Sequence, residues 1–343
     1  MDTSDRRIVL LGKTGVGKSS LASTIFGEDS LENNPTPKSD TIKCEVETKS
    51  VSGRSITVID TPGLFDTDRS EDELRAEIVR CVVESAPGPH AFLLLLKVDK
   101  YTEHEQAVIN KIQEYFSEDV FNYAIAVFTH GDQLGEGQTL EDFVGLDQYL
   151  TDHVWKKCGG RCFVIDNKYW QDKPKDEYRS NQFQIKEILK SIDKMIKANK
   201  DGYYTNEMYQ AVEGEIQEDM KVIRRSSVNM SENEIREKAK KSTTEKLLIG
   251  LAGVATGVIL GALLGLSTSI MAVMGVVVKQ KMSPGLLVKA VTKAAAIGHQ
   301  AAKGADSPME AAKKTVEAVK DEAQSVFRGL LHKKNEKSEK KDP

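Results

Sequence analysis

Short apolar runs and segments of helical spacing alternate along the first part of the chain. The apolar runs are residues 8–11, 56–59, 91–96, 124–128 and 162–165. An unbroken apolar run of this length is typical of a strand that is covered on both faces. The segments of helical spacing are residues 21–26, 71–84, 102–116, 139–155 and 183–196. Strands that alternate with helices in this way predict an α/β fold, in which helices flank a mainly parallel sheet.

One further strand is expected at the edge of this sheet. Residues 41–50 alternate polar and apolar side chains, which is typical of a strand with one exposed face. Ser52 and Gly53 give a turn signal between this segment and the run at 56–59, so the two strands are expected to pair. Residues 31–40 are polar and contain two prolines, which predicts a loop.

The carboxyl-terminal part of the chain has a different pattern. Residues 208–223 and 234–244 are polar with a thin apolar stripe, which predicts two helices that either extend the domain or act as a stalk. Residues 247–278 contain no charged side chain. Residues 279–343 are rich in Ala and Lys and end in a charged stretch, which predicts a basic helix followed by a disordered tail.

The uncharged stretch at 247–278 is long enough to enter a membrane. A helix over its whole length would extend about 48 Å, whereas the apolar core of a bilayer is about 30 Å thick. We expect a single span near 247–266, with a re-entrant hairpin that turns near 267–269 as the alternative. A third reading is a soluble hairpin packed on the domain. Glycine recurs at every fourth position, at Gly253, Gly257, Gly261 and Gly265. This spacing favours close helix–helix contact in lipid.

A glycine-rich stretch, GKTGVGKS at residues 12–19, directly follows the first apolar run. Glycines let the backbone adopt positive φ and point successive N–H groups at a phosphate, and the helix that follows adds the positive end of its dipole. In such a loop Lys18 reaches the β- and γ-phosphates and Ser19 is placed to ligate Mg²⁺. The predicted nucleotide-contacting residues here are Gly12, Lys13, Thr14, Gly15, Val16, Gly17, Lys18, Ser19 and Ser20.

Further contacts with phosphate and metal are expected beyond this loop. Asp60 follows the second apolar run, where a carboxylate can hold Mg²⁺ opposite Ser19. Gly63 follows at the spacing D-x-x-G, so its N–H can approach the γ-phosphate. A threonine in or near the loop before the edge strand is expected to complete the site, with Thr41 as first choice and Thr36 as the alternative. The predicted metal ligands are therefore Ser19, Thr41 and Asp60.

Selection of the base is expected from the sequence THGD that follows the fourth apolar run. Asp132 can accept two hydrogen bonds from guanine, one from N1–H and one from the exocyclic amine. Adenine cannot donate this pair, so Asp132 favours GTP over ATP. Thr129 and His130 are expected to line the same pocket. Asp166, Asn167 and Lys168, after the fifth run, are expected to close it, with Asn167 available to the base. Either His130 or Trp170 can stack on the purine, although both are equally explained as packing residues.

The net charge and the first residues of the chain limit which binding partners and which cellular compartment are expected. The formal net charge is −4, which gives no positive field that would hold nucleic acid. The first residues, MDTSDRR, are charged and contain no apolar core, so no secretory signal is predicted. We expect the nucleotide-binding part in the cytosol.

Taken in order, the motifs of the chain carry a family resemblance. They are GKTGVGKS, VIDTPGLFD, GPHAFLLLLKVDKYTEHE and FTHGDQL, the last in place of the more usual N-K-x-D. Residues 8 to about 200 resemble the GTPases of immunity-associated proteins (GIMAP, or AIG-type), relatives of the septins and of the chloroplast import GTPases. The resemblance implies binding of GTP and GDP, self-association across the nucleotide face when GTP is present, and attachment to intracellular membranes through the carboxyl-terminal region.

We therefore expect a GTP-binding switch that oligomerises on an intracellular membrane. The expected parts are an AIG-type guanine-nucleotide-binding domain at 1–200, a helical extension at 201–246, a membrane segment at 247–278 and a basic helix with a tail at 279–343. The alternatives are a dynamin-like hydrolase that remodels membranes and a scaffold in which GTP is structural.

Hydrolysis of GTP is expected to be slow. In Ras-like proteins a glutamine directly after D-x-x-G orients the attacking water, and here that position is Leu64, which cannot hold water. A second protomer or a partner would then supply the missing group. Candidates for such a group are Arg69, Glu103, His104 and Glu105, whose simpler explanation is a capped helix and a solvated face.

Overall fold

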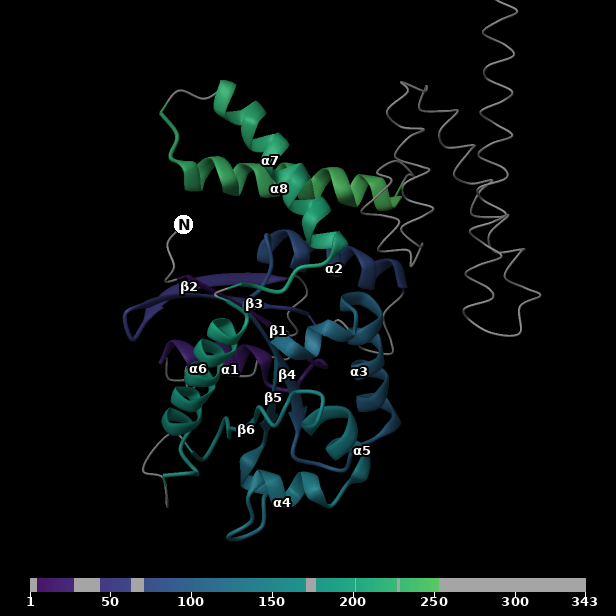
Figure 1. The fold of residues 1–343 in the computed structure, drawn as a ribbon, viewed down its shortest axis with the longest axis vertical. Helices are drawn as coiled ribbons and strands as arrows, with labels where there is room; N and C mark the ends of the chain where they lie inside the picture. The colour runs from purple at the N-terminus through teal and green to yellow at the C-terminus, as the bar shows by residue number, and fades with distance from the viewer. Residues whose placement is uncertain are drawn as a thin grey trace, which may run out of the picture. The chain divides into compact units, whose positions relative to one another are not determined.

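The computed structural model describes residues 5–27, 44–62, 71–170, 177–200, 202–226 and 229–252 (Figure 1). The chain divides into two compact units, Met1–Thr244 and Glu245–Pro343. Of the second unit, only the end of one helix is described. The predicted features that lie outside the described residues are Thr36, Thr41, Gly63, Leu64, Arg69 and residues 253–343.

A six-stranded sheet forms the centre of the first unit. Its strands are β1 (Arg6–Leu11), β2 (Glu45–Val51), β3 (Arg54–Asp60), β4 (Ala91–Lys97), β5 (Ala124–Thr129) and β6 (Cys162–Val164). Their order is β2-β3-β1-β4-β5-β6, and every neighbouring pair is parallel except β2 and β3, which form an antiparallel hairpin at one edge. The sheet confirms the predicted α/β fold with its mainly parallel strands.

Helices cover both faces of the sheet (Figure 1). The long ones are α1 (Lys18–Phe26), α2 (Glu71–Ser85), α3 (Glu103–Phe116), α6 (Asn181–Ala198), α7 (Glu207–Ser226) and α8 (Glu232–Ala252). Apolar side chains of α1 and α6 share one core with β1, β3, β4 and β5. On the other face, Phe92 of β4 meets Phe116 of α3 with ring centroids 5.3 Å apart. Because helices cover both faces of the sheet, the side chains on both sides of the central strands are apolar, which explains the continuous apolar runs in the sequence.

One predicted helix is interrupted. The segment predicted at 139–155 consists of α4 (Leu140–Gly145), α5 (Gln148–Leu150) and the π-helical turn η4 (Thr151–Trp155). Asp147 causes the break, because its carboxylate accepts hydrogen bonds from the backbone N–H of Tyr149 (2.8 Å) and of Leu150 (3.1 Å) and so caps a new helix. The apolar spacing alone did not reveal this cap. Two short 3₁₀ turns, η2 (Glu118–Tyr123) and η3 (Gly131–Gln133), complete the described elements.

The chain returns to the core after α6. Tyr204 is 1% exposed, and its ring lies 5.3 Å from that of Phe92 and 6.5 Å from that of Phe116 between centroids. Further along, the hydroxyl of Tyr209 on α7 lies 2.8 Å from the hydroxyl of Ser85 on α2. Residues after position 200 therefore contribute to the same core as the sheet.

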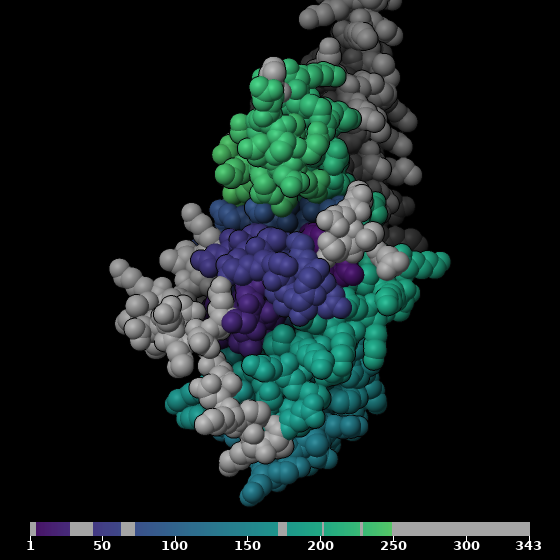
Figure 2. Space-filling model, turned by 90° about the vertical axis from the view of Figure 1, so that its left-hand side faces the viewer, coloured from purple at the N-terminus to yellow at the C-terminus, as the bar shows by residue number. Residues whose placement is uncertain are grey.

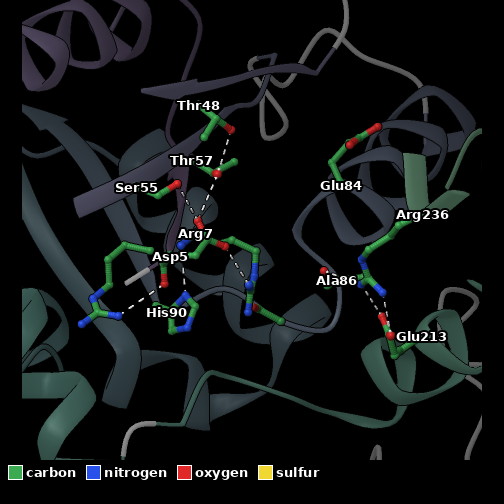
Figure 3. A network of polar contacts seen from close by, with 12 residues as sticks. Asp5, Arg7, Thr48, Ser55, Thr57, Glu84, Ala86, His90, Glu213 and Arg236 are labelled. Carbon is green, nitrogen blue, oxygen red and sulfur yellow. Dashed lines mark hydrogen bonds and ion pairs between the residues drawn. The ribbon is translucent and has the colours of Figure 1, made fainter. Parts of the chain in front are cut away.

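A polar network at the amino-terminal end of β1 and β4 connects the core to α8 (Figure 3). The Arg236 guanidinium of α8 donates to both carboxylate oxygens of Glu213 on α7, at 2.9 and 2.7 Å, and to the carbonyl oxygen of Ala86 at 3.0 Å. Nearby, the backbone N–H of Arg7 donates to Nδ1 of His90 at 2.9 Å. Burial, assisted by neighbouring arginine charges, lowers the pKa of His90 to about 3, so the ring is neutral.

The edge hairpin lies at the surface of the first unit (Figure 2). Side chains of β2 are mostly exposed, including Val46 at 42%. Its partner β3 is buried from Val58 to Asp60, because it lies between β2 and β1. The predicted edge strand at 41–50 is thus confirmed, beginning at Glu45.

No helix within the described ranges has both the length and the apolar character that crossing a bilayer requires. The segment predicted to enter a membrane, 247–278, is described only as far as Ala252, where α8 ends. The remainder of that segment lies outside the described residues.

Candidate functional site

The candidate site lies at the carboxyl ends of β1, β3, β5 and β6, where the glycine-rich loop joins β1 to α1. Gly15 and Gly17 have φ values of 68° and 100°, in the left-handed region that favours glycine. Gly17 also has no room for a side chain, because a Cβ there would lie 2.5 Å from Nδ2 of Asn167. The loop therefore turns tightly and brings its backbone against the residues that follow β6.

Lys18 and Ser19 open α1 and face the loop and β3. The Lys18 Nζ donates to the carbonyl oxygens of Gly12 (3.1 Å) and Lys13 (2.9 Å), and the side chain is buried. The Ser19 hydroxyl donates to Oδ2 of Asp60 at 2.6 Å. The ammonium thus lies against the backbone of the loop, and the hydroxyl lies beside a carboxylate.

Asp60 is a buried carboxylate at the end of β3. Burial raises its pKa, although the Ser19 hydroxyl and the Lys18 charge both act to lower it. Among the described residues its Oδ1 has no hydrogen-bond partner. A buried carboxylate oxygen of this kind, next to a serine hydroxyl, matches the oxygen ligands that Mg²⁺ prefers. The predicted pair Ser19 and Asp60 therefore fits a metal ion, whereas Thr41 lies outside the described residues.

Thr129 lies behind the loop rather than in front of it. Its side chain is completely buried, and its hydroxyl lies 2.9 Å from the carbonyl oxygen of Val16 and 3.3 Å from that of Leu96. Through these contacts the end of β5 supports the phosphate loop. The predicted contact of Thr129 with a ligand stays a prediction.

His130 and Trp170, the two candidates for stacking on a base, have different surroundings. His130 has a left-handed backbone (φ 61°) and its Nδ1 lies 3.0 Å from the Thr129 hydroxyl. Trp170 is 6% exposed and packs on Gly131, where a Cβ would lie 2.6 Å from the indole ring. Trp170 therefore serves as packing, and His130 remains the better candidate for stacking.

Asp132 lies exposed just beyond β5, beside Asp166, which belongs to the segment expected to close the base pocket. The backbone N–H of Asp132 donates to Oδ2 of Asp166 at 3.4 Å. Asp166 is 2% exposed. Burial makes the largest contribution to the raised pKa of Asp132, and the neighbouring Asp166 makes the next largest.

Asn181, the first residue of α6, is a further member of the site that sequence reasoning missed. Its side-chain amide brackets the backbone of Asp166: Oδ1 accepts from the Asp166 N–H at 3.0 Å, and Nδ2 donates to the Asp166 carbonyl oxygen at 2.6 Å. The segment that carries Asn167 is thereby fixed to α6. In the sequence, the only signal for Asn181 is that a helix is expected to begin near residue 180.

Lys13 connects the loop to α3. Its Nζ lies 2.6 Å from Oε1 of Glu105. The other carboxylate oxygen of Glu105, Oε2, accepts from the backbone N–H of Thr102 at 3.1 Å and so forms the predicted capping box. Burial opposes ionisation of Glu105, but the hydrogen bonds from Lys13 and Thr102 outweigh it and lower its pKa. Glu105 thus has a structural role within its own chain.

Comparison with known proteins places the chain in a family. The model of the AIG1 family matches residues 6–223. The chain belongs to the AIG1 family. In Arabidopsis thaliana, immune-associated nucleotide-binding protein 10 is 33% identical to this AIG1-family chain over 250 residues, covering 70% of the chain and 52% of that protein. Immune-associated nucleotide-binding protein 8 is 36% identical over 213 residues, covering 61% and 58%.

The AIG1-family chain thus spans little more than half the length of these two relatives. Among solved structures, Toc33 from Arabidopsis thaliana in complex with Mg²⁺ and GMPPNP is 19% identical, with a TM-score of 0.45, and the match covers 57% of the chain and 86% of Toc33. Toc33 in complex with GDP and Mg²⁺ is 21% identical, with a TM-score of 0.44, and covers 56% and 84%.

Proposed function

We propose that this AIG1-family protein binds GTP and GDP together with Mg²⁺ and works as a guanine-nucleotide switch. The observation that carries the proposal is that three groups converge at the carboxyl ends of the strands. They are the glycine loop with Lys18, the Ser19–Asp60 pair at 2.6 Å, and Asp132 beside Asp166. Ligands of open parallel sheets bind at the carboxyl ends of the strands. The names of the two relatives, which describe nucleotide-binding proteins, agree with the proposal.

Each part of the site has a defined task in this proposal. Lys18 and the loop N–H groups hold the β- and γ-phosphates, and Asp132 accepts from the guanine base. Ser19 and Asp60 hold Mg²⁺, which neutralises phosphate charge when it is bound. The loops around residues 36–41 and 64–68 are the segments expected to respond to the γ-phosphate.

Calorimetric titration of the full chain with GTP, GDP and ATP tests this proposal. Loss of two hydrogen bonds to a carboxylate should weaken ATP relative to GTP by about a hundredfold or more. Lys18→Ala should abolish binding of all three nucleotides, and Asp132→Ala should remove only the preference for guanine. Lys156→Ala, which removes an exposed lysine, is the matched control. Failure to bind guanine nucleotide, or equal affinity for ATP, would contradict the proposal.

We further propose that GTP drives self-association and that isolated chains hydrolyse it slowly. Leu64 gives no group to orient water, so turnover per molecule should rise with protein concentration if a second copy completes the site. Light scattering with GDP and with a non-hydrolysable GTP analogue measures the association. Equal mass in both states, or fast single-turnover hydrolysis by dilute monomer, would count against this part.

Attachment to an intracellular membrane through residues 247–278 is likewise a proposal, supported by the absence of charge across that stretch. Carbonate extraction of the full chain, beside a chain that ends at Thr244, tests it in cells. The full chain should remain with the membrane pellet and the shorter chain should be released. Release of both would contradict membrane insertion.

A further inference from the structure

The side chain of Lys13 connects the proposed phosphate loop to the start of α3. Its Nζ lies 2.6 Å from Oε1 of Glu105, and the two side chains are 29% and 24% exposed. Glu105 is the third residue of α3, which begins at Glu103. The cation belongs to the loop and the carboxylate belongs to a separate helix, so this ion pair is a contact that the loop can gain or lose.

The two oxygens of the Glu105 carboxylate have separate contacts. Oε1 faces Lys13, whereas Oε2 accepts from the backbone N–H of Thr102 at 3.1 Å and from the Thr102 hydroxyl. Thr102 is the residue that caps the amino-terminal end of α3. The cap therefore does not depend on Lys13, and the ion pair can open while α3 stays capped.

The backbone of Lys13 lies next to Lys18, the lysine that is proposed to hold the β- and γ-phosphates. The Lys13 carbonyl oxygen accepts from Nζ of Lys18 at 2.9 Å. A carbonyl oxygen lies about 2.4 Å from the Cα of its own residue, so the Lys13 Cα is within about 5.5 Å of the Lys18 ammonium. The lysine side chain is a flexible stem about 6 Å long. The Lys13 ammonium can therefore reach an anion that Lys18 also contacts.

We propose that Lys13 recognises the γ-phosphate and that Glu105 competes with this phosphate for the Lys13 ammonium. This inference rests on the proposed function. Lys18 and the loop N–H groups contact the β-phosphate, which GTP and GDP share, whereas Lys13 adds affinity for GTP alone. A γ-phosphate carries more negative charge than the single carboxylate of Glu105, so at equal distance it attracts the ammonium more strongly. Binding of GTP then exchanges one ion pair for another, and no covalent bond changes.

The exchange removes the ion pair that connects the loop to α3. With Lys13 on the γ-phosphate, Glu105 remains at Thr102 through Oε2 but no longer holds the loop. GDP has no γ-phosphate, so with GDP the ion pair between Lys13 and Glu105 is retained. The start of α3 therefore has a different contact with the loop for each of the two nucleotides.

The test is the ratio of the affinities for GMPPNP and GDP, measured by calorimetry with the full chain and Mg²⁺. Lys13→Met removes the ammonium but keeps an unbranched side chain, so this ratio should fall at least about tenfold. Glu105→Gln removes the competing charge but keeps an acceptor for the Thr102 N–H, so the ratio should rise about two- to fivefold. The double variant should match Lys13→Met within about twofold, because it has no ammonium to release.

The ion pair between Lys190 and Glu187 on the surface of α6 provides matched controls. Lys190→Met and Glu187→Gln should each leave the ratio unchanged. An ion pair with only a structural role would change the affinities for both nucleotides equally, so an unchanged ratio in Lys13→Met would overturn the inference. A ratio that does not rise in Glu105→Gln, or a double variant that differs from Lys13→Met, would overturn it as well. Absence of any guanine-nucleotide binding by the wild type would instead refute the proposed function itself.

Discussion

Gly17 shows how much of the site depends on single residues. With φ at 100°, it adopts a backbone conformation that other residues reach only with strain. A Cβ at this position would lie only 2.5 Å from Nδ2 of Asn167 and 3.5 Å from Cγ2 of Thr129. The phosphate loop, the end of β5 and the segment after β6 therefore meet at one glycine.

Thr129 offers a test of this support at the level of one hydrogen bond. Thr129→Val keeps the shape of the buried side chain but leaves the carbonyl oxygen of Val16 without its hydroxyl contact. We expect a loss of about 1–2 kcal/mol in the free energy of unfolding, measured with urea, and weaker nucleotide binding through a looser loop. Thr129→Ser retains the hydroxyl and should lose less. Equal stability of Thr129→Val and wild type would show that the hydrogen bond contributes nothing.

At the scale of elements, α7 and α8 are held to the core by contacts that differ in burial. The Arg236–Glu213 pair is partly buried and also reaches Ala86 at the end of α2. By contrast, the Arg224–Glu232 pair links the same two helices at the exposed surface. Exposed pairs contribute little, because solvent screens them and the side chains lose freedom.

This contrast predicts different effects for two arginine substitutions. Arg236→Ala leaves the Glu213 carboxylate and the Ala86 carbonyl oxygen without their shared donor, so we expect a loss of about 1–2 kcal/mol in the free energy of unfolding. Arg224→Ala should leave it unchanged. The measurement is urea unfolding of both variants beside wild type. A larger effect at Arg224 than at Arg236 would contradict the assignment of Arg236 as the anchor.

His90 makes the stability of β1 and β4 depend on pH. Its pKa is about 3 in the folded protein but near 6.5 in an unfolded chain, so between these values the unfolded chain binds more protons. Stability contributed by neutral His90 is therefore complete above about pH 6.5 and is lost as the pH falls toward about 3. His90→Asn, which keeps an acceptor for the Arg7 N–H, should flatten the urea midpoint between about pH 7 and about pH 5. An unchanged slope would contradict this role.

At the scale of the whole molecule, the first unit extends beyond the predicted domain boundary at residue 200. Tyr204 and Tyr209 are buried against β4, α3 and α2, and a chain that ends at 200 would leave those surfaces uncovered. Truncation of a large buried aromatic side chain costs about 3–5 kcal/mol. Residues 1–200 should therefore unfold at much lower urea concentration than residues 1–244, or fail to fold. Equal midpoints would show that the later segment is dispensable.

The parts of the molecule that could be predicted from the sequence are those encoded by contiguous residues. The strands, the glycine loop and the carboxylate that ends β3 each follow from a few neighbouring positions, because strand burial and phosphate binding impose local patterns. The contact between Asp132 and Asp166 depends instead on which strands lie side by side. Asn181 and Tyr204 belong to the same class, since nothing near them in sequence names the distant group they contact.

The burial of Tyr204 also has a consequence for synthesis of the protein. The aromatic ring that fills the space between β4 and α3 is encoded after every strand of the sheet and after α6. While the ribosome is still translating α6, the nascent chain has all six strands but lacks this ring, so Phe92 and Phe116 stay partly uncovered. The emerging chain should therefore depend on chaperones until the residues around Tyr204 have left the exit tunnel.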